Sequence, residues 1–261
     1  QKIIDGIELH HKKSKNILYK LFGDSNIINP IVKKKSINKN NIEIVHTNEK
    51  IKGEDTAFAA AKRGKKTSMW LAIESVKNKN SDIVISAGNT GALFVISKLN
   101  LKMIENIDKP ALSGLWPNKN GMNVVLDLGA NIECDEKNLI DFALMGSSLF
   151  KSLFTHELPK VALLNVGSEE IKGNDKIKNT YKKLSEIKNN NFEFKGYIEG
   201  NKIMDGDVNV IVTDGFTGNI ALKTAEGTAN FLIKELKNTL TSNILAKISS
   251  AINFNNIRKF K

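Results

Sequence analysis

Short runs of β-branched and aliphatic residues alternate with longer segments of helical periodicity through most of this chain of 261 residues. This alternation is typical of β-α-β units, in which parallel strands form a sheet and the helices cover its faces. The sequence therefore predicts an α/β fold, a three-layer α/β/α sandwich with a mostly parallel sheet. No linker interrupts the alternation, so we expect a single domain over residues 1–261.

The expected strands are residues 17–22, 42–46, 82–86, 124–127, 161–165, 192–197 and 208–213. The expected helices are residues 54–78 with an interruption near Gly64, then 91–103, 139–153, 176–188 and 220–240. The spacing of apolar residues by three and four positions is clearest in the last of these helices.

Composition narrows the class of protein. No stretch approaches the roughly 18–20 apolar residues that a membrane-spanning helix needs. The chain opens on polar residues without the pattern of a signal peptide, and its single cysteine fits a reducing compartment. We expect a cytoplasmic protein.

A formal net charge of +11 raises the question of a nucleic-acid partner. Nearly all of the positive charge is lysine, with only two arginines, and no exposed aromatics alternate with the basic residues. Base-edge readout and single-strand binding need those features, so we expect no nucleic acid. The lysines can form a solvated surface that binds no partner, or they can form a surface that attracts an acidic protein or anionic lipid.

The strongest indication of a binding site in the sequence is a strand-turn-helix motif that occurs twice. Residues 84–93 read VISAGNTGAL and residues 211–222 read IVTDGFTGNIAL. Glycine permits a sharp turn, and a helix that begins directly after it offers free N–H donors to phosphate. One such turn is more often a plain strand-to-helix connection, but two similar copies favour a binding role. The predicted phosphate- or substrate-binding residues here are Gly88, Asn89, Thr90, Gly91, Asp214, Gly215, Thr217 and Gly218.

Two further polar turns follow expected strands. Residues 124–131 read VVLDLGAN and end at Asn131, and residues 162–174 read ALLNVGSEEIKGN and end at Lys172, Gly173 and Asn174. Ligands collect at the carboxyl ends of parallel strands, so these turns are expected to face one crevice, with Asn131, Gly173 and Asn174 as further phosphate- or substrate-binding residues. Lys172 would bring an ammonium to an anion, although a lone surface lysine would be unremarkable in this chain.

Several familiar sites are missing from the sequence. There is no P-loop, no Gly-x-Gly-x-x-Gly and no Gly-x-Ser-x-Gly, and the four histidines lack metal-ligand spacing. We expect no metal and no cofactor, and no catalytic role for Cys134. The predicted phosphate-binding turns are not accompanied by a nucleotide-binding motif, which indicates that phosphate itself is a reactant.

With these motifs in order, the chain resembles the phosphate acyltransferase family of bacterial phospholipid synthesis. The resemblance rests on ISAGNTGAL, LDLGAN, LLNVGSEEIKGN and VTDGFTGNIALKTAEG, and it runs over essentially the whole chain. It implies a homodimer with the fold of isocitrate dehydrogenase and phosphotransacetylase. The implied reaction moves a fatty acyl group from acyl carrier protein to inorganic phosphate, giving an acyl phosphate for a downstream membrane acyltransferase. In the family's motifs the catalytic lysine and asparagine fall on Lys172 and Asn219.

The resemblance also has gaps. The family's N-terminal strand with the turn after it, and its C-terminal Gly-Gly-Ala and His-Gly-Ser segments, have no counterpart in these 261 residues. We therefore expect a partial chain, incomplete at both ends, from an active protein.

The expected mechanism needs no covalent intermediate with the protein, because a thioester is already activated toward attack by phosphate. The two glycine turns would supply backbone donors, Lys172 would neutralise charge, and Asn219 would donate to the developing oxyanion. We expect Asp127 and Asp214 to shape turns rather than to transfer protons. Asn131 and Glu199 are further pocket candidates.

A C-terminal amphipathic segment with basic flanks, Leu240, Ile244, Leu245 and Ile248, is a candidate for membrane contact at the inner face of the plasma membrane. A buried dimer helix would show the same pattern. Two other functions also stay open: a phosphotransacetylase-like enzyme that uses a short-chain acyl-CoA, and a non-catalytic membrane scaffold of lipid synthesis.

Overall fold

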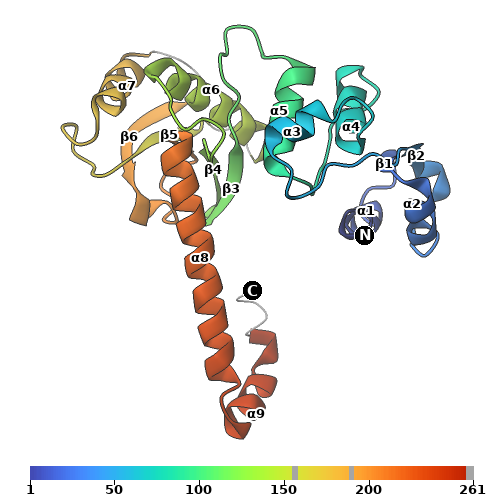
Figure 1. The fold of residues 1–261 in the computed structure, drawn as a ribbon. Helices are drawn as coiled ribbons and strands as arrows, with labels where there is room; N and C mark the ends of the chain where they lie inside the picture. The colour runs from blue at the N-terminus through green and yellow to red at the C-terminus, as the bar shows by residue number, and fades with distance from the viewer. Residues whose placement is uncertain (155–157, 188–190, 257–261) are drawn as a thin grey trace. The chain divides into compact units, whose positions relative to one another are not determined.

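A computed structural model describes residues 1–154, 158–187 and 191–256 (Figure 1). The chain divides into two compact units, Gln1–Pro110 and Ala111–Lys261, and each is described by itself. The expectation of a single domain over residues 1–261 stays a prediction.

The second unit is built on a five-stranded sheet in which all strands but one are parallel. The edge strand β3 runs antiparallel to β4, whereas β4, β7, β5 and β6 follow one another in parallel. The strands span Ser113–Asn118 (β3), Gly121–Leu126 (β4), Lys160–Asn165 (β5), Glu193–Glu199 (β6) and Val210–Val212 (β7). The short β7 lies at the centre because it pairs with both β4 and β5.

Strand side chains alternate between two cores, one on each face of this sheet. Val124 and Leu126 belong to a core with the helices α6 (Glu136–Leu153) and α7 (Asp175–Glu186). Val125, between them, belongs to a core with the first part of α8 (Gly215–Leu240). Such period-two alternation follows from strand geometry. It produces the expected α/β/α sandwich, which is confirmed.

Helix α6 lies close to the sheet because of a glycine. A Cβ built on Gly146 would lie 2.5 Å from Cγ1 of Val210 and 2.8 Å from Cδ2 of Leu126. Both neighbours are buried core side chains with no room to move away. By contrast, a Cβ on Gly227 in α8 would meet nothing within 4 Å.

We expect the substitution Gly146→Val to lower the free energy of unfolding by about 1–3 kcal/mol, because it overpacks the core. The matched control Gly227→Ala should raise it by about 0.5–1 kcal/mol, because alanine favours an open helical position. Urea unfolding followed by circular dichroism measures both. A Gly146→Val protein as stable as the wild type would contradict the packing argument.

The first unit has a small parallel sheet and two groups of helices. Strands β1 (Tyr19–Gly23) and β2 (Ile42–His46) pair with each other in parallel, and this pairing sets Leu21 beside Ile44. Both residues pack with Ile4 of the N-terminal helix. The accompanying helices are α1 (Lys2–His11), α2 (Ser25–Val32) and the 3-10 turn η1 (Lys39–Asn41). A separate core joins α3 (Ala57–Lys62), α4 (Ser68–Lys77) and α5 (Thr90–Leu101).

Most predicted elements are present. The expected helix over residues 54–78 divides around Gly64, as predicted, and the strand over residues 42–46 is confirmed. The expected end of the 176–188 helix lies outside the described residues. The sequence did not predict α1, α2, β3 or the two 3-10 turns, η1 and η2 (Gly200–Lys202).

The predicted buried strand over residues 82–86 is wrong. Ile83 and Ile85 are 73% and 76% exposed, and no strand is formed there. An apolar run becomes a strand only when a neighbouring strand accepts its backbone hydrogen bonds, and neither sheet pairs with this segment among the described residues.

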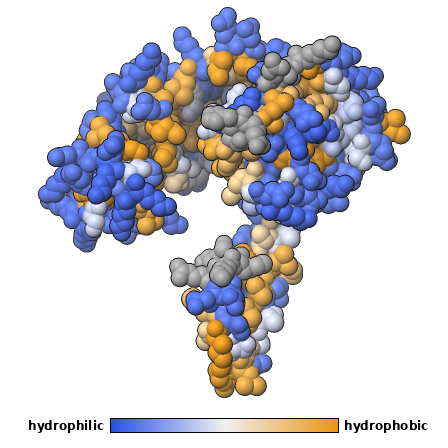
Figure 2. Space-filling model, turned by 180° about the vertical axis from the view of Figure 1, so that it is seen from behind, coloured by the Kyte–Doolittle hydropathy of each residue, from blue (hydrophilic) through white to orange (hydrophobic). Residues whose placement is uncertain are grey.

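The C-terminal helices carry many exposed apolar side chains. Only the first part of α8 packs on the sheet, and its later residues Phe231, Leu232 and Ile233 are exposed. The following helix α9 (Ile244–Ile252) is also apolar and exposed, as the orange surface of this region in Figure 2 shows. Within the described residues, no helix is long and apolar enough to span a membrane.

Candidate functional site

The turn after β4 is organised by one buried carboxylate. Asp127 is 0% exposed. Its Oδ1 accepts from the backbone N–H groups of Leu112 at 3.1 Å, Gly129 at 3.1 Å and Ala130 at 2.9 Å. Its Oδ2 accepts from the backbone N of Asn131 at 2.8 Å and from the Asn131 amide Nδ2 at 2.7 Å. The predicted turn-shaping role of Asp127 fits this geometry.

The first turn of α8 lies directly on this loop. The Gly215 amide donates to the Asn131 carbonyl at 2.8 Å. A Cβ on Gly218 would lie 1.9 Å from the carbonyl oxygen of Asp127, and a Cβ on Gly215 would lie 2.5 Å from that of Asn131. These glycines are therefore required for the approach of helix and loop, a role that sequence reasoning did not assign to them.

Asn219 completes the junction. Its amide Nδ2 donates to the Leu128 carbonyl at 3.2 Å, and it lies against Gly129, which has a φ of +129°. The residue is otherwise exposed. The structure thus brings together Asn131, Asn219 and the Gly215–Gly218 turn, three of the predicted groups.

We expect Asp127→Ala to lower the free energy of unfolding by about 3 kcal/mol, because several part-buried N–H donors lose their acceptor at once. Asp175→Ala is the control, since that carboxylate is 97% exposed and its one ion pair in the described part of the chain is long, 3.9 Å to Lys178. Thermal and urea unfolding test the pair. Similar losses for the two variants would remove Asp127 from its organising role.

Lys172 lies in the turn after β5, which is braced by an asparagine. Nδ2 of Asn165 donates to the carbonyls of Gly167 and Lys172, both at 3.1 Å, and the Lys172 amide donates to the Glu169 carbonyl at 2.9 Å. Gly173 has a φ of +93°, which favours glycine. The Lys172 ammonium has no hydrogen bond or ion pair within the described residues. Its backbone is fixed while its charge is available.

Three of the four predicted turns share one edge of the sheet, and the Gly88–Gly91 turn belongs to the first unit. Strands β4, β5 and β7 are parallel, so the loops that follow them all emerge at their carboxyl ends. These loops contain Asp127, Lys172 and Asp214 respectively. This is the edge where parallel sheets bind ligands.

Three predicted binding residues are helix N-caps. Asn89 accepts from the Ala92 amide at 2.9 Å, Asn174 from the Ile177 amide at 3.0 Å, and Asp214 from the Thr217 amide at 2.8 Å. The Thr217 hydroxyl also donates to Asp214, at 3.0 Å. Their side-chain oxygens therefore hold the turns, and ligand donors must come from neighbouring groups.

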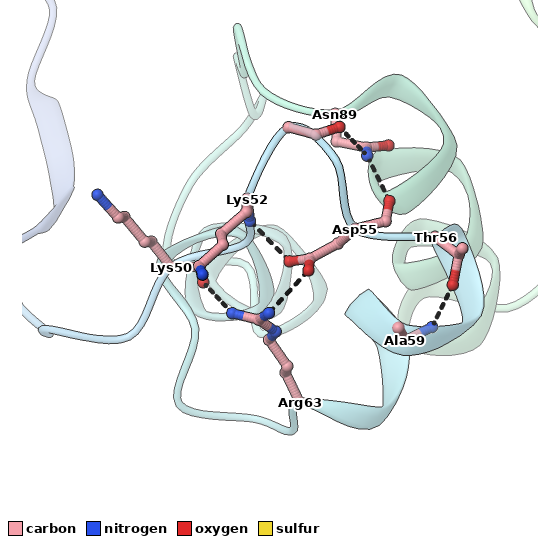
Figure 3. A network of polar contacts seen from close by, with 8 residues as sticks. Lys50, Lys52, Asp55, Thr56, Ala59, Arg63 and Asn89 are labelled. Atoms are coloured by element: carbon pink, nitrogen blue, oxygen red, sulfur yellow. Dashed lines mark hydrogen bonds and ion pairs between the residues drawn. The ribbon is translucent and has the colours of Figure 1, made fainter.

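In the first unit, the Gly88–Gly91 turn leads into α5. Figure 3 shows Asn89 of this turn with its hydrogen-bond partners. The Gly88 amide donates to the Ser86 hydroxyl at 3.2 Å. The Thr90 and Gly91 amides, at the start of the helix, have no acceptor within the described part of the chain. They are the free N–H donors that a phosphate-binding site at a helix N-terminus requires.

Glu199 ends β6 and lines a separate cavity of about 240 Å³ with Ser168, Lys195 and Lys202. The 166–174 turn beside it is tied to α7, because the Tyr181 hydroxyl donates to Glu170 at 3.0 Å. This hydrogen bond raises the pKa of Tyr181. Glu199 therefore lines a cavity apart from Lys172 and Asn219, and its place in the substrate pocket stays a prediction.

Cys134 is buried at 5% exposure within the core of α6 and the sheet. Sequence reasoning missed Asn165, which braces the Lys172 turn. The signal was present, because a polar residue stands directly after the apolar run of β5.

Comparison with known proteins places this geometry among the phosphotransacetylase-like α/β folds. The EutD phosphotransacetylase from Staphylococcus aureus superposes with a TM-score of 0.57 at 16% identity, over 85% of this chain and 77% of that chain. At this level of identity the likeness concerns the fold alone.

The sequence comparisons define the family. A family model described as "Fatty acid synthesis protein" matches residues 1–261. A phosphate acyltransferase from Pelagibacter ubique is 66% identical over 261 residues, 100% of this chain and 78% of that protein. One from Paramagnetospirillum magneticum is 40% identical over 259 residues, 99% of this chain and 74% of that protein. The chain belongs to this fatty acid synthesis family, whose curated relatives are phosphate acyltransferases, and the predicted resemblance is confirmed.

Proposed function

We propose that this protein transfers a fatty acyl group from acyl carrier protein to inorganic phosphate and so forms an acyl phosphate for phospholipid synthesis. A downstream membrane acyltransferase would consume that product. Family membership over residues 1–261 supports acyl transfer to phosphate. The carrier-protein donor rests on the motif resemblance and on the net charge of +11, which favours encounter with an acidic partner.

The observation that carries the proposal is the Lys172 ammonium. Three hydrogen bonds fix the backbone around it through Asn165 and Glu169. The ammonium extends from the same sheet edge as Asn219 and is not neutralised by a carboxylate within the described residues. A cation with no ion-pair partner among the described residues, held on a braced turn, suits an oxygen-rich dianion.

In the proposed step, a phosphate oxygen attacks the thioester carbonyl carbon. A new C–O bond joins that carbon to the phosphate oxygen, the C–S bond breaks, and the departing thiolate of the carrier takes up the proton of the hydrogen phosphate. Lys172 neutralises charge on phosphate, and Asn219 donates to the carbonyl oxygen as it becomes negative. Asn219 can do so after exchanging its present bond to the Leu128 carbonyl. Within the first unit, the free amides of Thr90 and Gly91 are a phosphate-binding group in their own right.

We expect Lys172→Ala and Asn219→Ala each to lower the rate of acyl phosphate formation by about 10²–10³, the usual loss for one electrostatic donor. The assay supplies palmitoyl carrier protein and phosphate, with acetyl-CoA as an alternative donor. Lys176→Ala is the control, because this exposed lysine follows on α7. Normal rates for either variant would remove that residue from the mechanism, and a preference for acetyl-CoA would favour a phosphotransacetylase activity.

We also propose that the exposed apolar surface of α8 and α9 serves a homodimer and peripheral membrane contact. Phe231, Leu232 and Ile233 on α8 are more than half exposed, which suits a partner helix. On α9, Ile244 and Leu245 are 76% and 78% exposed. Ile248 and the helix end at Leu240 border the same surface. An apolar helix beside lysines suits the interface of an anionic bilayer.

We expect Leu245→Glu to weaken flotation with anionic liposomes at least about fivefold, because a carboxylate replaces an inserted apolar side chain. Ser249→Glu adds the same charge beside the apolar face of the same helix and serves as the control. Sedimentation of both variants reports the dimer. Unchanged flotation of Leu245→Glu would contradict membrane contact through α9.

A further inference from the structure

The loop before α3 is closed by an arginine fork that reaches both of its ends (Figure 3). Nη2 of Arg63 lies 2.7 Å from Oδ1 of Asp55, and Nη1 donates to the Lys50 carbonyl at 3.3 Å. The other carboxylate oxygen of Asp55 accepts from the Lys52 amide at 2.7 Å. The Asp55 side chain is only 10% exposed, against 36% for Arg63. A planar guanidinium can bridge two acceptors in this way.

The closed loop presents two carbonyls to the turn that begins α5. Nδ2 of Asn89 donates to the Gly53 carbonyl at 3.0 Å and to the Asp55 carbonyl at 2.8 Å. Its Oδ1 accepts from the Ala92 amide at 2.9 Å. Both amide hydrogens and the amide oxygen of Asn89 are thus used. The orientation of this side chain is set by the loop on one side and by the helix on the other.

Asn89 stands next to Thr90 and Gly91, whose amides are open at the start of α5. A shift of the Gly53 or Asp55 carbonyl would move Asn89 and, with it, the direction of these amides. Arg63 itself is one helix away, at the C-cap of α3, and does not contact the turn within the described residues. It can act on the turn only through Asp55.

We propose that Asp55 and Arg63 are positioning residues for the phosphate-binding turn at Gly88–Gly91. The inference rests on the proposed function, in which this turn binds inorganic phosphate. Neither residue touches the phosphate. Their ion pair holds the carbonyls that orient Asn89, and Asn89 holds the first helical amides in the direction of the anion.

The test compares steady-state kinetics of Arg63→Ala, Asp55→Asn and the double variant in the purified protein. Each single substitution is expected to raise the KM for phosphate about tenfold, as a misplaced binding group does, with little change in kcat or in the KM for the acyl donor. The KM for phosphate of the double variant should be no higher than that of the more affected single variant, because the two residues act as one unit. Arg63→Lys should recover part of the loss, since an ammonium reaches Asp55 without bridging to Lys50.

Lys52→Ala is the matched control. Its backbone amide still donates to Asp55, and its side chain has no partner within the described residues. A KM increase in this control equal to that of Arg63→Ala, or losses that multiply in the double variant, would overturn the proposal. If Arg63→Ala fails to fold, Asp55→Asn carries the same test.

Amide hydrogen exchange separates this inference from the proposed function. Exchange over residues 88–93 should be faster in Arg63→Ala and unchanged in Lys52→Ala, whatever the reaction is. A wild-type protein that forms no acyl phosphate would refute the proposed function. The exchange rates would still test whether Arg63 positions the turn. Unaltered exchange in Arg63→Ala would refute the positioning role even in an active enzyme.

Discussion

The Asp127 carboxylate is the interaction on which the candidate site of the second unit depends. Five hydrogen bonds converge on its two oxygens and curl the chain after β4 back toward α8. The loop carbonyls then receive the Gly215 amide and the Asn219 side chain. Because Gly218 has no side chain, the helix can rest on this loop. One buried anion therefore fixes the loop and the start of the helix together.

Much of the fold could be predicted from the sequence because strand and helix periodicities are set locally. The alternation of Val124, Val125 and Leu126 already separates the two faces of the sheet. The failure at residues 82–86 has a different origin, because an apolar run does not reveal whether a partner strand is available. Strand β3 was missed for a related reason, since Pro117 interrupts a run that only pairing with β4 makes a strand.

The position of the candidate site could be predicted more readily than the part each side chain plays in it. Glycine-rich turns after strands mark the sheet edge where Lys172 and Asn219 lie. The sequence did not reveal that Asn89 and Asn174 cap helices, because the same short polar residues suit caps and ligands alike. The pairing of Asp55 with Arg63 depends on the way α3 turns back, and no motif encodes it.

The capped turns have a consequence for the thermodynamics of association. Asn89, Asn174 and Asp214 satisfy helix donors from within the chain, so these turns are ordered before any anion arrives. The entropy of fixing the backbone is therefore spent during folding and not during binding. A small dianion can then associate by exchanging water for amides that already point outward, with little accompanying change in heat capacity.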